Sequence, residues 1–130
     1  MARYIAPGRL VRAVVNPLVM RFGAATTLVV RARVTGRTQA VPVNVLDYEG
    51  GRYLVAVRGE TQWVRNLRAA GECELRRRGR VYRYVAEEVP VEDREPVIAA
   101  YRERWDSQVR RFFQALPDPA DHPVFRLRQA

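Results

Sequence analysis

The chain has 130 residues, with 23 basic and 14 acidic side chains and a formal net charge of +9. Its 48% hydrophobic content excludes a disordered tail, and its single cysteine, Cys73, excludes an internal disulfide and favours a reducing, cytoplasmic compartment. The length fits one domain over residues 1–130. Every basic residue is arginine, which either a GC-rich genome or the use of arginine's planar fork on phosphate and carboxylate would explain.

The N-terminal third is a basic segment, because no acidic residue precedes Asp47. Apolar residues at helical spacing predict short helices at residues 8–15 and 17–22, interrupted before Pro17, within an N-terminal helical segment 1–23. A basic amphipathic segment could contact an anionic membrane surface, although packing against the rest of the fold is the favoured interpretation. The segment lacks the uninterrupted apolar stretch of a signal peptide or a membrane span.

Strand patterns follow. Segments rich in Val and Thr predict strands at residues 26–34 and 40–48, and Pro42 places the second at an edge or a bulge. Glu49-Gly50-Gly51 predicts a hairpin turn to a return strand at 52–58. A helix is predicted over residues 62–70, ended by Gly71, with Trp63, Leu67 and Ala70 on one face.

The second half of the chain repeats this alternation. Residues 73–78 and 81–89 predict a hairpin, residues 92–113 a helix whose inner face carries Val97, Ile98, Tyr101 and Trp105, and residues 124–128 a last strand. Hairpin-linked strands form antiparallel sheets. The fold class is therefore mainly β (α+β): a small barrel of about six antiparallel strands with flanking helices.

Side-chain catalysis has little support in the sequence. His122 is the only histidine and is interpreted as a surface or cap residue, so neither a metal site nor a Cys–His pair is expected. Ser107 lacks a nucleophile-elbow motif, and the acidic pairs at 87–88 and 92–93 are interpreted as solvated element ends. We therefore expect no catalytic side chain, and a cofactor that supplies the chemistry.

Residues 58–71 read as a strand end, a glycine turn and a helix start. Backbone N–H groups and the positive end of the helix dipole point outward at such a junction, which makes it a candidate anion site. A second basic segment, Arg76-Arg77-Arg78, lies near Tyr82 and Tyr84 and raises single-stranded nucleic acid as a partner. A half-exposed hairpin explains the same pattern and is favoured over nucleic acid.

Three motifs carry a resemblance to a known family. They are Thr35-Gly36-Arg37 followed by Pro42-Val43-Asn44, the hairpin Gly50-Gly51-Arg52-Tyr53, and the distinctive run from Arg58 to Arg68. With His122-Pro123-Val124-Phe125 they cover most of residues 25–128. The chain resembles the deazaflavin-dependent nitroreductase family, a branch of the split β-barrel flavin and deazaflavin oxidoreductases.

The resemblance implies a split barrel of six or seven strands that binds coenzyme F420. Reduced F420 would pass a hydride to a small electrophilic acceptor, such as a quinone, a nitro compound or an activated alkene. A basic groove suits its phosphodiester and polyglutamate tail. FMN is the alternative cofactor, and a non-catalytic ligand-binding module is the alternative function. The protein would be a cytoplasmic monomer or homodimer.

The resemblance also implies site residues. Arg37 matches a turn residue near the coenzyme tail, Val43, Asn44 and Val45 match the strand that lines the ring, and Ala56, Arg58 and Gly59 match the loop near phosphate and ring. Gln62, Trp63, Arg65 and Asn66 match the helix start that closes the site, although Trp63 equally suits a core anchor. The segment Thr38–Val41 is shorter than the family usually has. Acceptor contacts would lie on the C-terminal helix, with Tyr101 and Trp105 as candidates.

Overall fold

The computed structural model describes residues 26–130, so the helices predicted at 8–15 and 17–22 lie outside the described part. Its strands are β1 (Thr26–Arg31), β2 (Thr38–Val43), β3 (Leu46–Tyr48), β4 (Gly51–Val55), β5 (Glu72–Arg77), β6 (Arg80–Glu88) and β7 (Val124–Gln129). The helices are α2 (Gln62–Ala70) and α3 (Glu95–Ala115), with short 3-10 turns η1 (Val91–Asp93) and η2 (Pro119–Asp121). The predicted order of elements is confirmed over this range, although strand 26–34 ends at Arg31.

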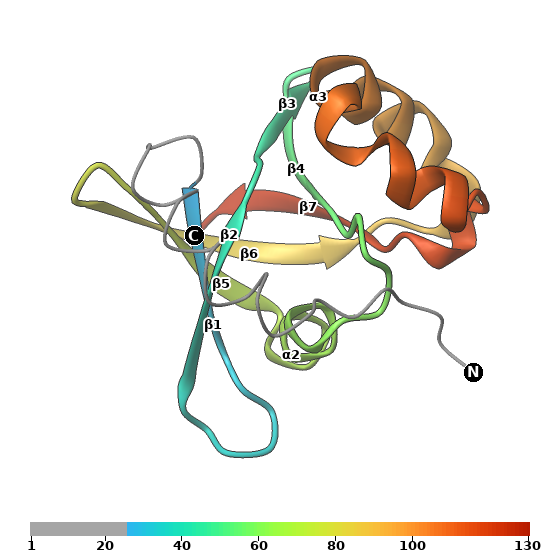
Figure 1. Ribbon diagram of the computed structural model, residues 1–130. Helices are drawn as coiled ribbons and strands as arrows, with labels where there is room; N and C mark the ends of the chain where they lie inside the picture. Colours follow the sequence, from blue (N-terminus) through green and yellow to red (C-terminus); the bar gives the residue numbers. More distant parts are fainter. Residues whose placement is uncertain (1–25) are drawn as a thin grey trace.

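All the strands belong to one antiparallel sheet with the order β2-β1-β5-β6-β7-β4-β3. β2 and β3 lie at opposite edges of this order, yet only Asn44 and Val45 separate them in the chain. Three Cα steps reach at most about 11 Å, so the two edges must approach each other and the sheet must curl. Figure 1 shows this curved sheet. The fold is mainly β and fits a split barrel, as predicted.

The single strand predicted at 40–48 is wrong. The chain leaves one edge of the sheet at Val43 and enters the other edge at Leu46, which makes seven strands of the expected six in the described residues. Alternating apolar residues continue across the break, so the pattern alone does not show it. Pro42 does lie in an edge strand, where a missing N–H removes no bond from an interior ladder.

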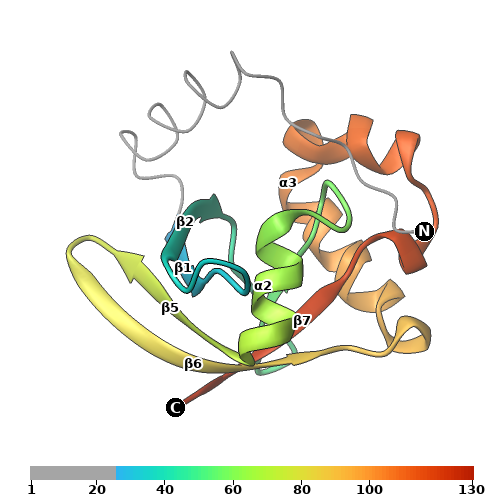
Figure 2. The same ribbon diagram turned by 90° about the horizontal axis from the view of Figure 1, so that it is seen from below.

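Two apolar clusters hold the helices on the sheet. Within the curve, α2 packs through the fully buried Leu67 against residues such as Leu28 and Phe125. On the other side, Val97, Ile98 and Tyr101 of α3 pack with Leu46, Val55 and Val124, and Trp105 packs against this cluster. Figure 2 shows α2 and α3 in these separate positions. The predicted inner faces of both helices are confirmed.

The boundaries of α2 follow their local signals. Thr61 is the N-cap with extended backbone, and Gly71 ends the helix in the left-handed region (φ 70°), where its N–H donates to the Leu67 carbonyl at 2.8 Å. The predicted helix bounds are confirmed. By contrast, α3 contains a non-helical residue, Trp105 (φ −123°, ψ 28°), which divides it into two segments. No proline or glycine occurs between residues 97 and 115 to signal this kink.

The prediction of a surface position for His122 is wrong, because this side chain is fully buried, whereas its predicted alternative as a cap residue is confirmed by its place at the C-cap of η2. Its Nδ1 lies 2.9 Å from the Ala56 carbonyl oxygen and its Nε2 lies 2.5 Å from that of Leu116. The ring also packs on Phe113, with 4.3 Å between centroids. His122 thus joins the end of β4 to the end of α3, a long-range position that its immediate sequence neighbours do not indicate.

Candidate functional site

The turn from Ala56 to Thr61, which joins β4 to α2, is held by backbone hydrogen bonds. The Ala56 N–H donates to the Pro123 carbonyl at 2.8 Å, which extends the β4–β7 ladder by one residue. The Gly59 N–H donates to the Ala56 carbonyl at 3.2 Å, and the Thr61 N–H donates to the Gly59 carbonyl at 2.8 Å. Gly59 has φ of 87°, a conformation that strains any residue with a Cβ.

The N-terminus of α2 opens from this turn without a side-chain cap. The Thr61 hydroxyl makes no capping bond, and its oxygen is buried without a partner among the described residues. The first turn carries no acidic residue. Since the first N–H groups of a helix lack internal partners and carry partial positive charge, this end of α2 suits an anion.

Arg58 precedes that helix end by a few residues in the chain and adds a partly desolvated cation. Its guanidinium lies over the Phe112 ring, 4.8 Å from the centroid, and Arg111 lies at the same distance from the same ring. Burial lowers the pKa of Arg58, and the nearby charge of Arg111 lowers it further. Within residues 26–130 no carboxylate forms an ion pair with Arg58. The two arginines therefore form an uncompensated positive region around Phe112.

The second segment of α3 also reaches the seam between β2 and β3. The side-chain amide of Asn44 donates to the Tyr101 hydroxyl at 3.3 Å and to Gln108 Oε1 at 3.4 Å. Gln108 and Phe112 are four residues apart and so lie on the same side of a helix. Asn44 and Arg58, both predicted site residues, consequently meet neighbouring turns of α3.

Asn66 joins α2 to the β1–β2 turn. It is only 4% exposed, and its Oδ1 accepts from the Arg33 N–H at 3.1 Å and from Arg33 Nη1 at 2.7 Å. Its amide nitrogen donates to Gln39 Oε1 at 2.7 Å, and Arg33 Nη1 also donates to Gln62 Oε1 at 3.0 Å. The Asn66 side chain thus has partners within the protein at both its polar atoms.

The other predicted site residues occupy three kinds of position. Val43, Val45, Ala56 and Trp63 pack with the inner apolar cluster, and the Trp63 ring lies 6.2 Å from that of Phe125. Arg65 is half-buried on α2, where its charge helps to lower the pKa of Glu60. Arg37 lies exposed in the β1–β2 turn. Their joint role in coenzyme binding stays a prediction.

Four residues outside the predicted set contact predicted site residues or lie with them in the structure: Arg33, Gln108, Arg111 and Phe112. Three of them lie on α3 after Trp105, where the kink changes the direction of the helix without a sequence signal. Arg33 lies in a segment predicted as strand. In the structure Arg33 lies in the turn between β1 and β2 and contacts α2, and this position could be known only from the register of the two strands.

Two surface hollows lie elsewhere and contain none of the predicted residues. One, of about 660 Å³, is lined by the β3–β4 turn and β7, and the other, of about 770 Å³, by β1, β5 and β6. In the first, Arg52 is already bound to Asp47 at 3.0 Å and to the Tyr84 hydroxyl at 2.6 Å. We therefore weigh the uncompensated charge at Arg58 above the size of these hollows.

The structure also weakens the nucleic-acid alternative. A stacking platform needs exposed aromatic faces beside the basic strand. Tyr84 is 6% exposed and belongs to the inner apolar cluster, so only Tyr82 of the predicted pair offers a face to solvent.

The comparisons with known proteins point to one enzyme family. The family model described as F420H(2)-dependent quinone reductase matches residues 8–114. A search of the curated proteins finds no match. Among solved structures, an F420-H2 dependent reductase (FDR-A) aligns with TM-score 0.59 and 19% identity over 79% of this chain and 92% of its own.

Two further structures show how widely the fold is used. An F420 reductase aligns with TM-score 0.56 and 15% identity, covering 82% of this chain and 86% of its own. HutZ, the heme storage protein from Vibrio cholerae, aligns with TM-score 0.60 and 18% identity, covering 88% and 89%. These identities show a shared fold. The match to the family model extends over most of the sequence, and the chain belongs to the F420H(2)-dependent quinone reductase family, an oxidoreductase family with F420 as coenzyme.

Proposed function

We propose that the protein transfers a hydride from reduced F420 to a small electrophilic acceptor, with a quinone as the first candidate and nitro compounds and activated alkenes as further ones. The observation that carries this proposal is the positive region at the Ala56–Thr61 turn. There, Arg58 has no ion-pair partner among the described residues, and α2 begins without an acidic side chain. An anionic coenzyme supplies the missing negative charge.

The residues present fit such a coenzyme. Arg58 and Arg111 would face its anionic part together with the first N–H groups of α2, and the partnerless Thr61 oxygen offers one more polar contact. Arg65 on α2 and Arg37 in the β1–β2 turn are candidates for the glutamate tail. When bound, F420 supplies the hydride.

The protein's own part is to bind, to orient and to exclude water. Val43 and Val45 are partly buried against the apolar cluster that contains Ala56, so they would offer an apolar surface to the flat ring of the coenzyme. The second segment of α3 contacts Asn44 through Gln108 and Arg58 through Phe112, so we place the acceptor along that segment. No protein nucleophile is required, because positioning and electrostatic stabilisation are sufficient roles for the chain.

Heme binding, which the name of the Vibrio cholerae protein states for that protein, has no support at His122. Heme iron takes an axial ligand such as a histidine nitrogen or a cysteine thiolate. Both ring nitrogens of His122 already lie within hydrogen-bond distance of carbonyl oxygens. Burial raises the pKa of the Cys73 thiol to about 12, which disfavours the thiolate form.

The cellular setting is a separate part of this proposal. No helix in the described part of the chain is long and apolar enough to cross a membrane. We place the enzyme in the cytoplasm, as a monomer or a homodimer of one domain. Contact of its basic N-terminal segment with a membrane surface is part of this proposal.

A titration of the purified protein with F420 and, separately, with FMN tests the proposal. Coenzyme fluorescence should change saturably with F420 and remain flat with FMN. Oxidation of reduced F420 by a soluble quinone should then accelerate on adding protein, and nitro and alkene acceptors rank the substrate classes. Saturable FMN binding without F420 binding would contradict the proposal, and F420 binding without turnover of any acceptor would favour the ligand-binding module.

A further inference from the structure

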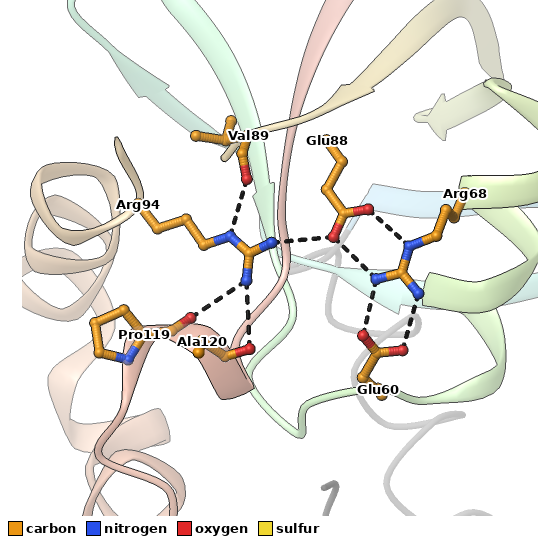
Figure 3. A network of polar contacts seen from close by, with 7 residues as sticks. All are labelled: Glu60, Arg68, Glu88, Val89, Arg94, Pro119 and Ala120. Atoms are coloured by element: carbon orange, nitrogen blue, oxygen red, sulfur yellow. Dashed lines mark hydrogen bonds and ion pairs between the residues drawn. The ribbon is translucent and has the colours of Figure 1, made fainter. Parts of the chain in front are cut away.

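Four charged side chains, one of them from the Ala56–Thr61 turn, form a connected network (Figure 3). Arg68 Nη1 and Nη2 donate to the two carboxylate oxygens of Glu60 at 3.0 and 2.8 Å. The same guanidinium donates through Nε and Nη2 to both oxygens of Glu88, at 2.7 and 2.9 Å. Arg94 Nη2 donates to Glu88 Oε2 at 3.1 Å. Two positive and two negative groups thus balance.

Arg94 anchors the network in the protein interior. Its side chain is 7% exposed, and its Nε donates to the Val89 carbonyl at 2.9 Å. Its Nη1 lies 3.4 Å from the carbonyl oxygens of Pro119 and Ala120. Burial lowers the pKa of Arg94, opposed by the nearby charge of Glu88. A buried cation with all of its nitrogens engaged is a firm support, because releasing it would leave several groups unsatisfied.

The network connects four parts of the fold. Glu60 lies in the turn before α2, Arg68 in the last turn of α2 and Glu88 at the end of β6. Arg94 immediately precedes α3 and reaches η2. Glu60 belongs to the same turn as Arg58 and is two residues away from it in the chain. The network therefore reaches the turn that carries Arg58.

The turn is therefore held at both of its ends by contacts with other parts of the fold. At its start, the Ala56 carbonyl faces His122, and the Ala56 N–H is bonded to Pro123. At its end, both carboxylate oxygens of Glu60 are bonded to Arg68. Between these points Arg58 projects onto Phe112 instead of pairing with the adjacent Glu60. Glu60, the carboxylate nearest in sequence to Arg58, is thus paired with Arg68 and not with Arg58.

We propose that Glu60, Arg68, Glu88 and Arg94 are positioning residues: they keep Glu60 away from Arg58 and hold the Arg58–Gly59 turn in the geometry that receives the anionic part of the coenzyme. The inference rests on the proposed function for its ligand, but its claim about the turn concerns the protein without coenzyme. Binding sites of this kind depend on supporting hydrogen bonds that lock the contacting residues.

The first test needs no coenzyme. Trypsin cleaves after arginine, so mass spectrometry can follow cleavage at the Arg58–Gly59 bond of the native protein. Glu60→Gln should raise the cleavage rate at this bond several-fold. The matched control is Glu74→Gln, which disturbs ion pairs to Arg76 and Arg83 at similar exposure, 26% against 20% for the carboxylate side chains, but lies on β5. An unchanged cleavage rate in Glu60→Gln would overturn the inference.

The second test measures F420 affinity. We expect Glu60→Gln to weaken binding about tenfold, as for a contact group that has lost its support, and Glu74→Gln to leave it unchanged. Glu60→Gln and Arg68→Gln should not add in the double variant, because both remove the same link. Additive losses would show that Glu60 and Arg68 act independently and would overturn the shared positioning role. Arg68→Lys, which keeps the charge without the fork, should recover part of the affinity lost in Arg68→Gln.

The two tests separate the two proposals. If the wild-type protein fails to bind F420, the proposed function fails, while the cleavage comparison still decides whether the network holds the turn. If the wild-type protein binds F420 and the Glu60→Gln variant binds equally well, the proposed function stands and the positioning inference is wrong.

Discussion

Two regions of this molecule are rich in arginine, and they differ in what surrounds the charge. At the Ala56–Thr61 turn, Arg58 is partly buried against Phe112, and Glu60 of the same turn belongs to the charged network. At the tip of the β5–β6 hairpin, Arg77, Arg78 and Arg80 are exposed and make no ion pair with a carboxylate of the described chain. Both regions contribute to the net charge of +9.

Positive charge alone therefore does not identify an anion-binding site. Solvent and salt screen the exposed arginines of the hairpin, so an anion gains little from each of them. At the turn, the charge is partly desolvated, its guanidinium lies over the Phe112 ring, and the N-terminus of a helix follows a few residues later in the chain.

Replacing His122 with alanine tests the support of the turn. We expect it to lower the free energy of unfolding by about 3 kcal/mol, because it leaves a cavity and removes the contacts of the buried ring with the carbonyl oxygens of Ala56 and Leu116. Urea denaturation measures the change. A loss below about 0.5 kcal/mol, the size of an ordinary surface substitution, would contradict the supporting role assigned to this residue.

Exchanging single arginines tests the contrast itself. Arg58→Ala should weaken F420 binding by about 1.5–3 kcal/mol, as expected for a charged hydrogen bond. Arg77→Ala at the hairpin tip removes the same charge and is the matched control, for which we expect no measurable change in affinity at physiological salt. Equal losses in the two variants would mean that only net charge matters.

The turn of the β5–β6 hairpin offers a prediction of opposite sign. Arg78 has φ of 51° and is followed by Gly79 with φ of 77°, a mirror-image turn in which asparagine is preferred at the first position. Arg78→Asn should therefore stabilise the protein by about 0.5–1 kcal/mol, measured as a rise in urea midpoint. Its F420 affinity should remain that of the wild type. A large loss of affinity would assign the hairpin a role in binding.

The smallest expected effect is a change in stability at acid pH. Hydrogen bonding from Arg68 lowers the pKa of Glu60 below its ordinary value of 4.5. A carboxyl group of this kind contributes stability above its unfolded pKa and loses it as the pH falls through the lower folded value. Since the pair is partly exposed, the contribution should be below about 1 kcal/mol. The wild type should thus approach the stability of Glu60→Gln below pH 4.5, and a constant difference would be inconsistent with the pair.

Local signals in the sequence were enough to predict most of the fold. Gly71 and the Glu49-Gly50 turn act on their own neighbours, so the end of helix α2 and the hairpins could be placed from the sequence. The break between β2 and β3 could not, because it depends on how the sheet closes and the apolar alternation continues through it. The kink at Trp105 likewise has no local cause in the sequence.

The site was predicted in part for the same reason. Arg58 and Gly59 stand at a strand-to-helix junction that local patterns identify, and the family resemblance named the other candidates. Arg111 and Phe112 of α3 lie near Arg58 only in the folded protein, because more than fifty residues separate them from Arg58 in the chain. The role of Glu60 depends on Arg68, Glu88 and Arg94, which come together from three other elements. Such contacts are set by tertiary packing, which a pattern along the chain does not contain.

Hydrogen exchange, measured with and without F420, tests the central claim most directly, because it maps where the coenzyme lies. We predict that saturating F420 slows exchange in residues 56–66 and in the second segment of α3, and leaves residues 76–83 of the hairpin unchanged. Protection confined to the hairpin, or to the hollow between the β3–β4 turn and β7, would contradict the placement of the coenzyme at Arg58.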